Sequence, residues 1–284
     1  MADVNESVGD FTGKTVVVTG ANSGIGLAAV LELARRGARV GLVGRDPGRL
    51  DAAVSAVRAT GGPEPLGFRA DYDALDSVRA LAAELAEAYP TIDILCNNAG
   101  GVIPSRQSTV DGHERTMQSN HLAPFLLTNL LRERLAGGRI VNTASDAHQG
   151  GALDPAHLDS PGGYRSFTVY GSSKQANIMF TAEAARRWPD ILSMSFHPGV
   201  VRTRFGRESF AVSLFFRIWP FLLTPERGAD TMLWLAGTPA EALTNGGYYV
   251  KRKRQQPAGI VADPDAASAL WEASASAVGL QLQP

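Results

Sequence analysis

Short apolar stretches along the chain alternate with longer segments in which apolar residues recur at helical spacing. The short stretches predict seven strands, at residues 15–20, 38–45, 65–72, 92–100, 137–145, 191–199 and 246–250. The longer segments predict helices at residues 27–37, 46–60, 73–90, 111–135, 169–188 and 226–236. Such alternation is typical of βαβ units, whose consecutive strands are parallel. The sequence therefore predicts an α/β fold: a doubly wound domain whose parallel seven-stranded sheet is flanked by helices on both faces.

The chain contains no internal repeat, low-complexity tract or linker, so we expect residues 1–284 to form a single domain. Residues 1–13 are interpreted as an N-terminal tail, because they lack the apolar run of a signal peptide or membrane anchor. The Gly- and Pro-containing segment 149–168 is interpreted as a loop. The most apolar long stretch, residues 210–223, is too short to span a bilayer. We therefore expect no integral membrane segment.

Composition narrows the function classes. The 284 residues carry a formal net charge of −1, which argues against nucleic acid as a partner, since phosphate binding needs a basic surface. The single cysteine, Cys96, excludes an internal disulfide and favours a reducing cytoplasm, and its apolar strand suggests an inert core residue. The five histidines show no metal-ligand spacing, so we expect no metal. These features favour a cytoplasmic protein that acts on small molecules.

The segment TGANSGIG (19–26) lies between the first predicted strand and the first predicted helix. Its glycines permit a left-handed backbone and a close approach to a ligand. The start of the following helix offers free N–H groups and a positive dipole end to a pyrophosphate. The spacing Gly20-x-x-x-Gly24-x-Gly26 differs from the common G-x-G-x-x-G dinucleotide fingerprint. Taken alone, the segment is also compatible with a plain strand-to-helix turn.

Taken together with the other motifs of the chain, this turn resembles the cofactor turn of the short-chain dehydrogenase/reductase family. The further motifs occur in the family's order: NNAG (97–100), Asn120, Ser145, Tyr170-x-x-x-Lys174 and HPGVVRT (197–203). The resemblance extends from about residue 14 to the C-terminus. It implies a Rossmann-type fold and an oxidoreductase that transfers a hydride between a nicotinamide cofactor and an alcohol or carbonyl.

The candidate catalytic residues are Asn120, Ser145, Tyr170 and Lys174. Free tyrosine titrates near pH ~10, too high for an efficient base at neutral pH, and a neighbouring ammonium favours the phenolate. Lys174 is four residues from Tyr170 and so shares its helix face. The resemblance implies that Lys174 also holds the nicotinamide ribose, that Ser145 orients the substrate oxygen and that Asn120 supports a water-linked proton path. Singly, these residues would be a helix-surface pair, a turn cap and a buried polar residue at a helix kink; their order favours catalysis.

Cofactor preference depends on the end of the second strand, where an acidic residue favours NAD and an arginine favours NADP. Here Gly44 is followed by Arg45, whose guanidinium can bind a 2′-phosphate, so we expect NADP(H) over NAD(H). Asp46 could pair with Arg45 or repel the phosphate. Asp71 resembles the family's aspartate beside the adenine, although a strand-end cap is an alternative. The full set of expected cofactor residues is Gly20, Asn22, Ser23, Gly24, Ile25, Gly26, Arg45, Asp71, Tyr72, Asn98, Ala99, Gly100, Tyr170, Lys174, Pro198, Gly199, Val201 and Thr203.

Within the family, several segments resemble the retinol-dehydrogenase-like branch: residues 120–131, 170–181 and 197–203, and GGYYV (246–250) followed by LWEAS (270–274). This implies a small apolar alcohol or carbonyl substrate. The aromatic segment 204–224 is expected to be a lid over an apolar pocket, with a core helix or a peripheral membrane contact as alternatives.

Two other functions remain open: a ketoreductase that tailors a secondary metabolite such as a polyketide or polycyclic ketone, and a non-catalytic NADP(H)-binding regulator. The resemblance also implies a homodimer or homotetramer, assembled through the helices that flank Tyr170. Among the remaining features, the basic run 251–254 is expected to be a solvated loop. His148 is expected to line the pocket, and His121 and His197 are expected to be packed or hydrogen-bonded.

Overall fold

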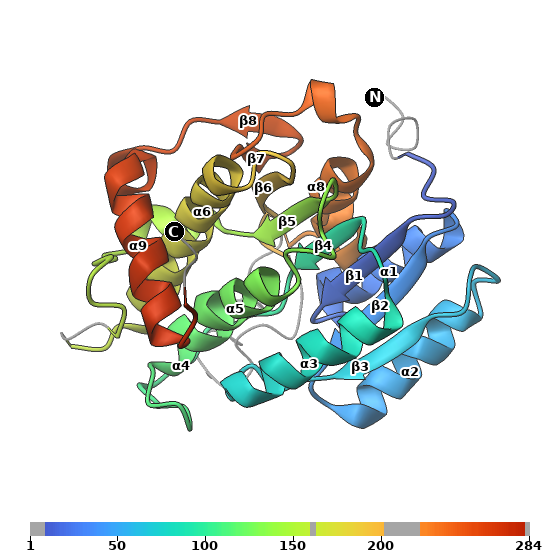
Figure 1. Ribbon diagram of the computed structural model, residues 1–284, viewed down its shortest axis with the longest axis horizontal. Coiled ribbons are helices and arrows are strands. Elements are labelled where there is room, and N and C mark those ends of the chain that lie inside the picture. Colours follow the sequence, from blue (N-terminus) through green and yellow to red (C-terminus); the bar gives the residue numbers. More distant parts are fainter. Residues whose placement is uncertain (1–8, 160–162, 202–221, 282–284) are drawn as a thin grey trace.

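The structure is a computed structural model that describes residues 9–159, 163–201 and 222–281. Its centre is a sheet in the order β3-β2-β1-β4-β5-β6-β7-β8 (Figure 1). The first seven strands are parallel, which confirms the predicted α/β Rossmann-type architecture. Their bounds are β1 Thr15–Thr19, β2 Arg39–Gly44, β3 Leu66–Arg69, β4 Ile94–Asn97, β5 Arg139–Thr143, β6 Leu192–His197 and β7 Tyr248–Val250.

An eighth strand corrects the expected number of seven. β8 (Lys253–Gln255) folds back on β7 as an antiparallel partner at the edge of the sheet. The predicted loop at 251–254 is therefore only a two-residue turn, in which Lys251 and Arg252 both have positive φ, 50° and 63°. The guanidinium of Arg252 is bound by Asp230, with a Nε–Oδ2 distance of 2.8 Å, which helps to hold this strained turn.

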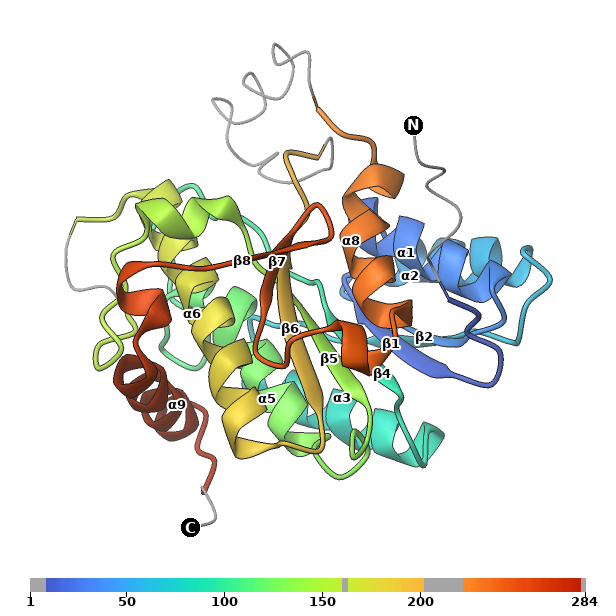
Figure 2. The ribbon, with the colours of Figure 1, turned by 90° about the horizontal axis from the view of Figure 1, so that it is seen from above.

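Helices cover both faces of the sheet (Figure 2). Side chains of β1 alternate between the faces, so that Val16 and Val18 pack with α1, α2 and α8, while Val17 packs with α3, α5 and α6. The helices are α1 Gly24–Arg35, α2 Pro47–Arg58, α3 Leu75–Ala88, α4 Arg115–Met117, α5 Ala123–Leu130, α6 Ser166–Arg187, α8 Pro225–Gly237 and α9 Pro264–Ala277. The carboxyl ends of the parallel strands meet at one edge of the sheet between these two apolar layers, where ligands bind in folds of this kind.

The predicted helix at 111–135 is shorter and interrupted. It starts at Arg115, where the carboxylate of Glu114 accepts the N–H groups of the first turn at 2.9 and 2.8 Å. A π-helical turn at Gln118–Leu122 separates α4 from α5. Pro124 follows this turn and has no N–H to donate to the carbonyl of Asn120, as an α-helix would require. The turn places Asn120 in the protein interior.

The C-terminal helix α9 packs on the outside of α6 (Figures 1 and 2). Trp271 of α9 is buried and meets the rings of Phe125, Phe180 and Trp188 at centroid distances of 5.0, 5.6 and 5.0 Å. Arg187 of α6 lies over the Trp271 ring, 4.9 Å from its centroid. α9 therefore occupies part of the face where we expected a second subunit to bind.

Candidate active site

The turn between β1 and α1 has the geometry of a nucleotide cradle. Gly20 and Gly24 have positive φ values, 66° and 53°, which favour glycine. A Cβ on Gly26 would lie 2.3 Å from the carbonyl oxygen of Gly20, so the helix packs against the turn only because this residue is glycine. The N-cap residue Ser23 makes no side-chain hydrogen bond to the helix start. The first turn of α1 can therefore offer its N–H groups to a pyrophosphate.

Asn22 and Ile25 fix this turn to its neighbours. A Cβ on Gly44, at the end of β2, would lie 2.8 Å from Asn22 Nδ2, so Asn22 crosses directly over that strand end. Ile25 packs on α8, because a Cβ on Gly228 would lie 3.0 Å from its side chain. Both residues thus hold the cradle in place from within the fold.

The segment after β4 is tied to the end of β1. The backbone N–H groups of Asn98 and Ala99 both donate to Thr19 Oγ1, at 3.0 and 2.9 Å, and Asn98 Nδ2 donates to the Thr19 carbonyl at 2.9 Å. Gly100 follows with φ 153°. A Cβ there would lie 2.7 Å from Asn120 Oδ1, so the backbone runs close to the interior polar residues. Asn98, Ala99 and Gly100 therefore border the cradle at the switch point between β1 and β4.

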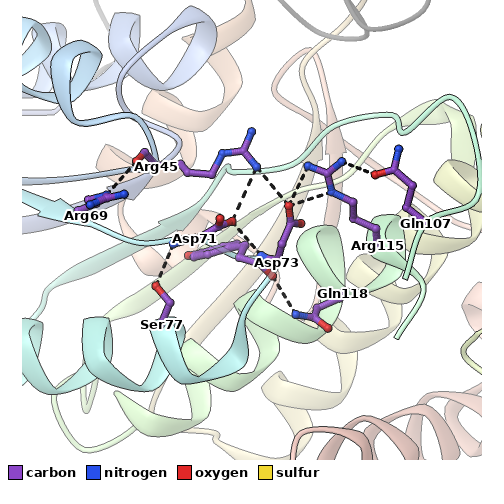
Figure 3. A network of polar contacts seen from close by, with 9 residues as sticks. Arg45, Arg69, Asp71, Asp73, Ser77, Gln107, Arg115 and Gln118 are labelled. Atoms are coloured by element: carbon purple, nitrogen blue, oxygen red, sulfur yellow. Dashed lines mark hydrogen bonds and ion pairs between the residues drawn. The ribbon is translucent and has the colours of Figure 1, made fainter. Parts of the chain in front are cut away.

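The strand ends of β2 and β3 carry a charged network (Figure 3). Arg45 Nη1 lies 3.2 Å from Asp73 Oδ2 and 3.7 Å from Asp71 Oδ1. Asp73 lies between two guanidinium groups, because Arg115 Nε also donates to its Oδ2 at 2.8 Å. Arg69 Nε donates to the Arg45 carbonyl at 3.4 Å. The sequence motifs indicated Arg45 and Asp71, but not Asp73 and Arg115.

Two of the open alternatives concern neighbouring carboxylates. Asp46 caps α2, accepting the Arg49 N–H at 2.8 Å, and its other oxygen lies 3.3 Å from the Arg49 guanidinium. Asp71 follows β3 and accepts the Asp73 N–H at 3.1 Å, which is a turn-capping contact. Tyr72 is buried, and its carbonyl accepts Gln118 Nε2 at 3.2 Å. Asp46 is thus used in capping, while Asp71 caps a turn and also lies near Arg45.

The structure brings Ser145, Tyr170 and Lys174 together at the carboxyl ends of β5 and β6. Tyr170 and Lys174 lie one turn apart near the start of α6, and Lys174 Nζ is 5.3 Å from the Tyr170 ring centroid. Ser145 lies close enough to the Tyr170 hydroxyl to lower the pKa of that phenol. Lys174 Nζ donates to the Thr143 carbonyl at 3.0 Å. A phenol, a hydroxyl and an ammonium group therefore lie close together, and such a group of side chains can move a proton to or from a substrate oxygen.

Burial shifts the proton affinities of the two ionisable groups in opposite directions. It raises the pKa of Tyr170 to about 12, and the hydrogen bond to Ser145 opposes this rise. It lowers the pKa of Lys174 to about 8. Desolvation is the largest cause acting on the phenol pKa, and it outweighs the opposing effect of Ser145. In this state the phenol is a proton donor and the lysine is close to its titration point at neutral pH.

Asn120 is fully buried and its side chain is held by three hydrogen bonds. Nδ2 donates to the Gly101 carbonyl at 2.9 Å and to Ser173 Oγ at 3.0 Å, while Oδ1 accepts the Gly101 N–H at 2.8 Å. Both Asn120 and Lys174 border Gly100, since a Cβ there would lie 3.7 Å from Lys174 Nζ. The side chain thus fixes the segment after β4 next to the lysine.

The HPGVVRT motif is described only in part. Pro198 and Gly199 directly follow β6, and Gly199 has φ 84°. Val201 is buried and forms a parallel bridge with Leu223. Thr203 and most of the expected lid at 204–224 lie outside the described residues.

Burial and hydrogen bonding explain the presence of His121, His197 and Cys96 near the site. His121 is fully buried, and burial lowers its pKa to about 4, which suits a packed, neutral ring. His197 Nδ1 accepts the Asp146 N–H at 3.2 Å. Burial raises the pKa of the Cys96 thiol to about 12, which disfavours its reactive thiolate. In the described ranges no group of three or more His, Cys, Asp or Glu residues could hold a metal ion.

A glycine cradle at a strand switch point, beside a buried tyrosine–serine–lysine group, defines a class: α/β oxidoreductases that bind a nicotinamide dinucleotide. Comparison with known proteins is more specific. Residues 14–212 match the family described as short chain dehydrogenase. The chain belongs to the short-chain dehydrogenase/reductase family, whose members bind a nicotinamide cofactor and interconvert alcohols and carbonyls.

Relatives place the chain in the retinol-dehydrogenase-like branch. It is 55% identical over 272 residues to a Streptomyces sp. (strain C5) protein provisionally named daunorubicin C-13 ketoreductase DnrU, covering 95% of this chain and 94% of that one. It is 38% identical over 292 residues to human retinol dehydrogenase 14, covering 94% and 87%. A crystal structure of an uncharacterised protein from Mycobacterium paratuberculosis superposes with a TM-score of 0.80 at 30% identity, covering 99% and 98%.

In the part of the chain that the structure describes, no helix combines the length and the apolar character that crossing a bilayer requires.

Proposed function

We propose that this protein is an NADP(H)-dependent ketoreductase that reduces an apolar, polycyclic ketone, with Tyr170 as the general acid. The observation that carries the proposal is the grouping of Tyr170, Lys174 and Ser145: Lys174 Nζ lies 5.3 Å from the Tyr170 ring centroid, and burial raises the pKa of the phenol to about 12 while Ser145 opposes the rise. A phenol in this state can give a proton to a carbonyl oxygen without first losing it to solvent. The proposal narrows the expected apolar alcohol or carbonyl substrate towards the ketoreductase alternative.

A nicotinamide cofactor, when bound at this site, would supply the hydride that reduces the carbonyl carbon. The Ser145 hydroxyl orients the substrate oxygen by hydrogen bonding, and its own position is set by the Ala147 N–H, which donates to it at 3.2 Å. Tyr170 then donates its proton to the same oxygen as negative charge develops there. Lys174 stabilises the resulting phenolate electrostatically and holds the nicotinamide ribose. Asn120 keeps the segment 98–101 in place and supports the proton path that restores Tyr170.

The remaining cofactor roles are proposed on the same basis. Gly20, Ser23, Gly24 and Gly26 hold the pyrophosphate, with Asn22 and Ile25 shaping the turn. The adenosine is held by Asp71 and Tyr72, and the nicotinamide side by Asn98, Ala99, Gly100, Pro198, Gly199, Val201 and Thr203. Arg45 binds the 2′-phosphate of NADP, because it directly follows β2 and places a guanidinium group at the end of that strand.

Two observations favour reduction of a bulky ketone over the other candidate functions. The 55% identical Streptomyces relative bears the name of a ketoreductase, whereas the retinol dehydrogenases are more distant at 38%. A retinol dehydrogenase is the second candidate, on the strength of that branch. A non-catalytic NADP(H)-binding regulator is disfavoured, because Asn120, Ser145, Tyr170 and Lys174 are all present and grouped.

Location and assembly complete the proposal. We propose a cytoplasmic protein, on the basis of a single cysteine that is buried. A homodimer or homotetramer built directly on α6 would have to accommodate α9, which covers that helix through Trp271 and through an ion pair of 2.8 Å between Arg187 and Glu272. We therefore propose that any second subunit contacts α9 or another surface.

The test is a panel of carbonyl compounds offered to the purified protein with NADPH, including 2-acetylanthracene, other polycyclic aryl ketones and all-trans-retinal. We expect alcohol formation from at least one polycyclic ketone, at a higher kcat/KM than from retinal. Tyr89→Phe is a matched control, because Tyr89 is buried far from the site and its hydroxyl has no partner among the described residues. Retinal reduction alone would favour the retinol-dehydrogenase reading, and no turnover of any compound would refute the proposal.

A further inference from the structure

A cavity of about 880 Å³ lies next to the candidate catalytic group but is not lined by Ser145 or Tyr170. Its floor is the 3₁₀ turn Asp146–Gly150, which starts directly after Ser145. Its outer wall is the β7–β8 hairpin and the segment that follows it, at the sheet edge seen in Figure 2. The volume is within the usual range for pockets that enclose a small organic molecule.

His148 contributes a directed polar atom to this cavity. It is only 7% exposed, and its Nδ1 lies 2.8 Å from the Ser145 carbonyl oxygen. A carbonyl can only accept, so Nδ1 carries the proton, and in the neutral ring Nε2 is left as an acceptor. Among the residues that the structure describes, Nε2 has no hydrogen-bond partner, while the residue itself lines the cavity. An acceptor without a protein partner on a largely buried ring is available to a ligand or water that donates to it.

Three other polar side chains of the cavity, those of Asp146, His197 and Tyr248, already have partners. Tyr248 donates its hydroxyl to Asp146 Oδ1 at 2.8 Å, and His197 Nε2 lies 3.4 Å from Asp146 Oδ2. His197 Nδ1 accepts the Asp146 N–H, so its Nε2 carries the proton that faces the carboxylate. The His148 ring meets the Tyr248 ring edge-on, with centroids 5.3 Å apart, which fixes its orientation. His148 Nε2 is thus the acceptor that these contacts leave for a ligand.

The rest of the wall suits an amphiphilic ligand. Val250, Ile260 and Val261 supply apolar surface, whereas Lys251 and Lys253 of the hairpin stand at the cavity with their charged side chains. The cavity therefore matches a molecule that combines an apolar ring system with hydroxyl groups better than it matches a pure hydrocarbon chain.

We propose that this cavity binds the part of the ketone substrate beyond its reacting carbonyl, and that His148 Nε2 accepts a hydrogen bond from a substrate hydroxyl group. The inference rests on the proposed function and narrows the substrate class to hydroxylated polycyclic ketones. Because His148 Nδ1 holds the carbonyl of Ser145, the residue links recognition of the hydroxyl to the segment that carries the catalytic serine.

The test compares 2-acetylanthracene with a set of its monohydroxylated isomers. A hydroxyl that pairs with a buried acceptor is expected to raise kcat/KM of the wild-type protein by about tenfold for at least one isomer. In His148→Asn, the amide nitrogen takes the place of Nδ1 and can still donate to the Ser145 carbonyl. The acceptor at the position of Nε2 is lost, so the variant should reduce the hydroxylated isomer and 2-acetylanthracene with about equal kcat/KM. His157→Asn is the matched control, since His157 is exposed and bound to Asp154; it should keep the preference.

The outcomes separate this inference from the proposed function. Reduction of 2-acetylanthracene and all hydroxylated isomers with equal kcat/KM would overturn the inference and leave the ketoreductase proposal standing. The same holds for a preference that persists in His148→Asn. Failure to reduce any polycyclic ketone would overturn both. The wild-type comparison needs no variant, so equal kcat/KM values would overturn the inference even where His148→Asn does not fold.

Discussion

Replacing Arg45 with glutamine should weaken the binding of NADPH and leave the binding of NADH nearly unchanged. The Arg45 guanidinium lies between the end of β2 and the carboxylate of Asp73, 3.2 Å away, which it shares with Arg115 (Figure 3). Glutamine keeps a similar length and hydrogen-bonding capacity but removes the positive charge. The substitution therefore tests whether the positive charge of Arg45 binds the 2′-phosphate of NADPH.

The size of the effect follows from the setting of this side chain. A hydrogen bond to a charged group contributes about 1.5–3 kcal/mol. The Arg45 side chain is 55% exposed and already paired with Asp73, so solvent screening and competition favour the lower part of that range. A loss of about 1.5–2 kcal/mol corresponds to roughly a 10- to 30-fold higher Kd for NADPH.

The assay is a titration of purified protein with NADPH and with NADH, followed by the enhancement of nicotinamide fluorescence. Arg58→Gln is the control, because Arg58 is an exposed arginine of the neighbouring helix α2 that pairs with Glu64 away from the strand end. An unchanged ratio of the two dissociation constants in Arg45→Gln would remove Arg45 from the phosphate site. An equal loss for both cofactors would show that Arg45 acts on the structure of the site and not on the phosphate.

Three further changes have defined outcomes. Lys174 should lose its charge as pH rises through about 8, so kcat/KM for reduction should fall above that pH, while Tyr170 stays protonated until about pH 12; a profile flat to pH 10 would contradict this. Trp271→Ala removes a buried ring from the contact between α9 and α6 and should lower the free energy of unfolding by about 3–5 kcal/mol in urea titrations, and a loss below about 1 kcal/mol would mean that α9 contributes little. Gly26→Ala forces a Cβ against Gly20 at a cost of about 1–3 kcal/mol, so NADPH should bind roughly 5- to 150-fold more weakly, as calorimetry can measure; unchanged binding would exclude this turn as the cofactor cradle.

The fold was predictable where periodicity was strong. The seven parallel strands and the residues of the cradle follow from short apolar runs that alternate with helical patterns, and Gly26 could be singled out from its position alone. β8 was missed because Lys253–Gln255 is an exposed, three-residue polar strand without an apolar face. The π-helical turn at 118–122 was missed because hydrophobic spacing does not reveal a one-residue change in hydrogen-bond register.

The site was predictable as a set of residues and less so as an electrostatic arrangement. The order of the motifs was enough to group Ser145, Tyr170 and Lys174. The rise in the Tyr170 pKa depends on how deeply the side chain is buried, which no local sequence pattern carries. Likewise, Asp73 and Arg115 are 42 residues apart and meet only through the packing of the tertiary structure. The charged residues at every second position of the segment RADYD (69–73) could have indicated Asp73, but nothing in the sequence indicated Arg115.

The central claim is that Tyr170 gives the proton that completes ketone reduction. The most direct measurement is a single-turnover experiment in which Tyr170→Phe, loaded with NADPH, is mixed with the polycyclic ketone that the wild-type protein reduces best. The account predicts unchanged NADPH binding and a rate of alcohol formation lower by about 10²–10⁴-fold, with Tyr89→Phe at the wild-type rate. Alcohol formation by Tyr170→Phe at the wild-type rate would contradict it.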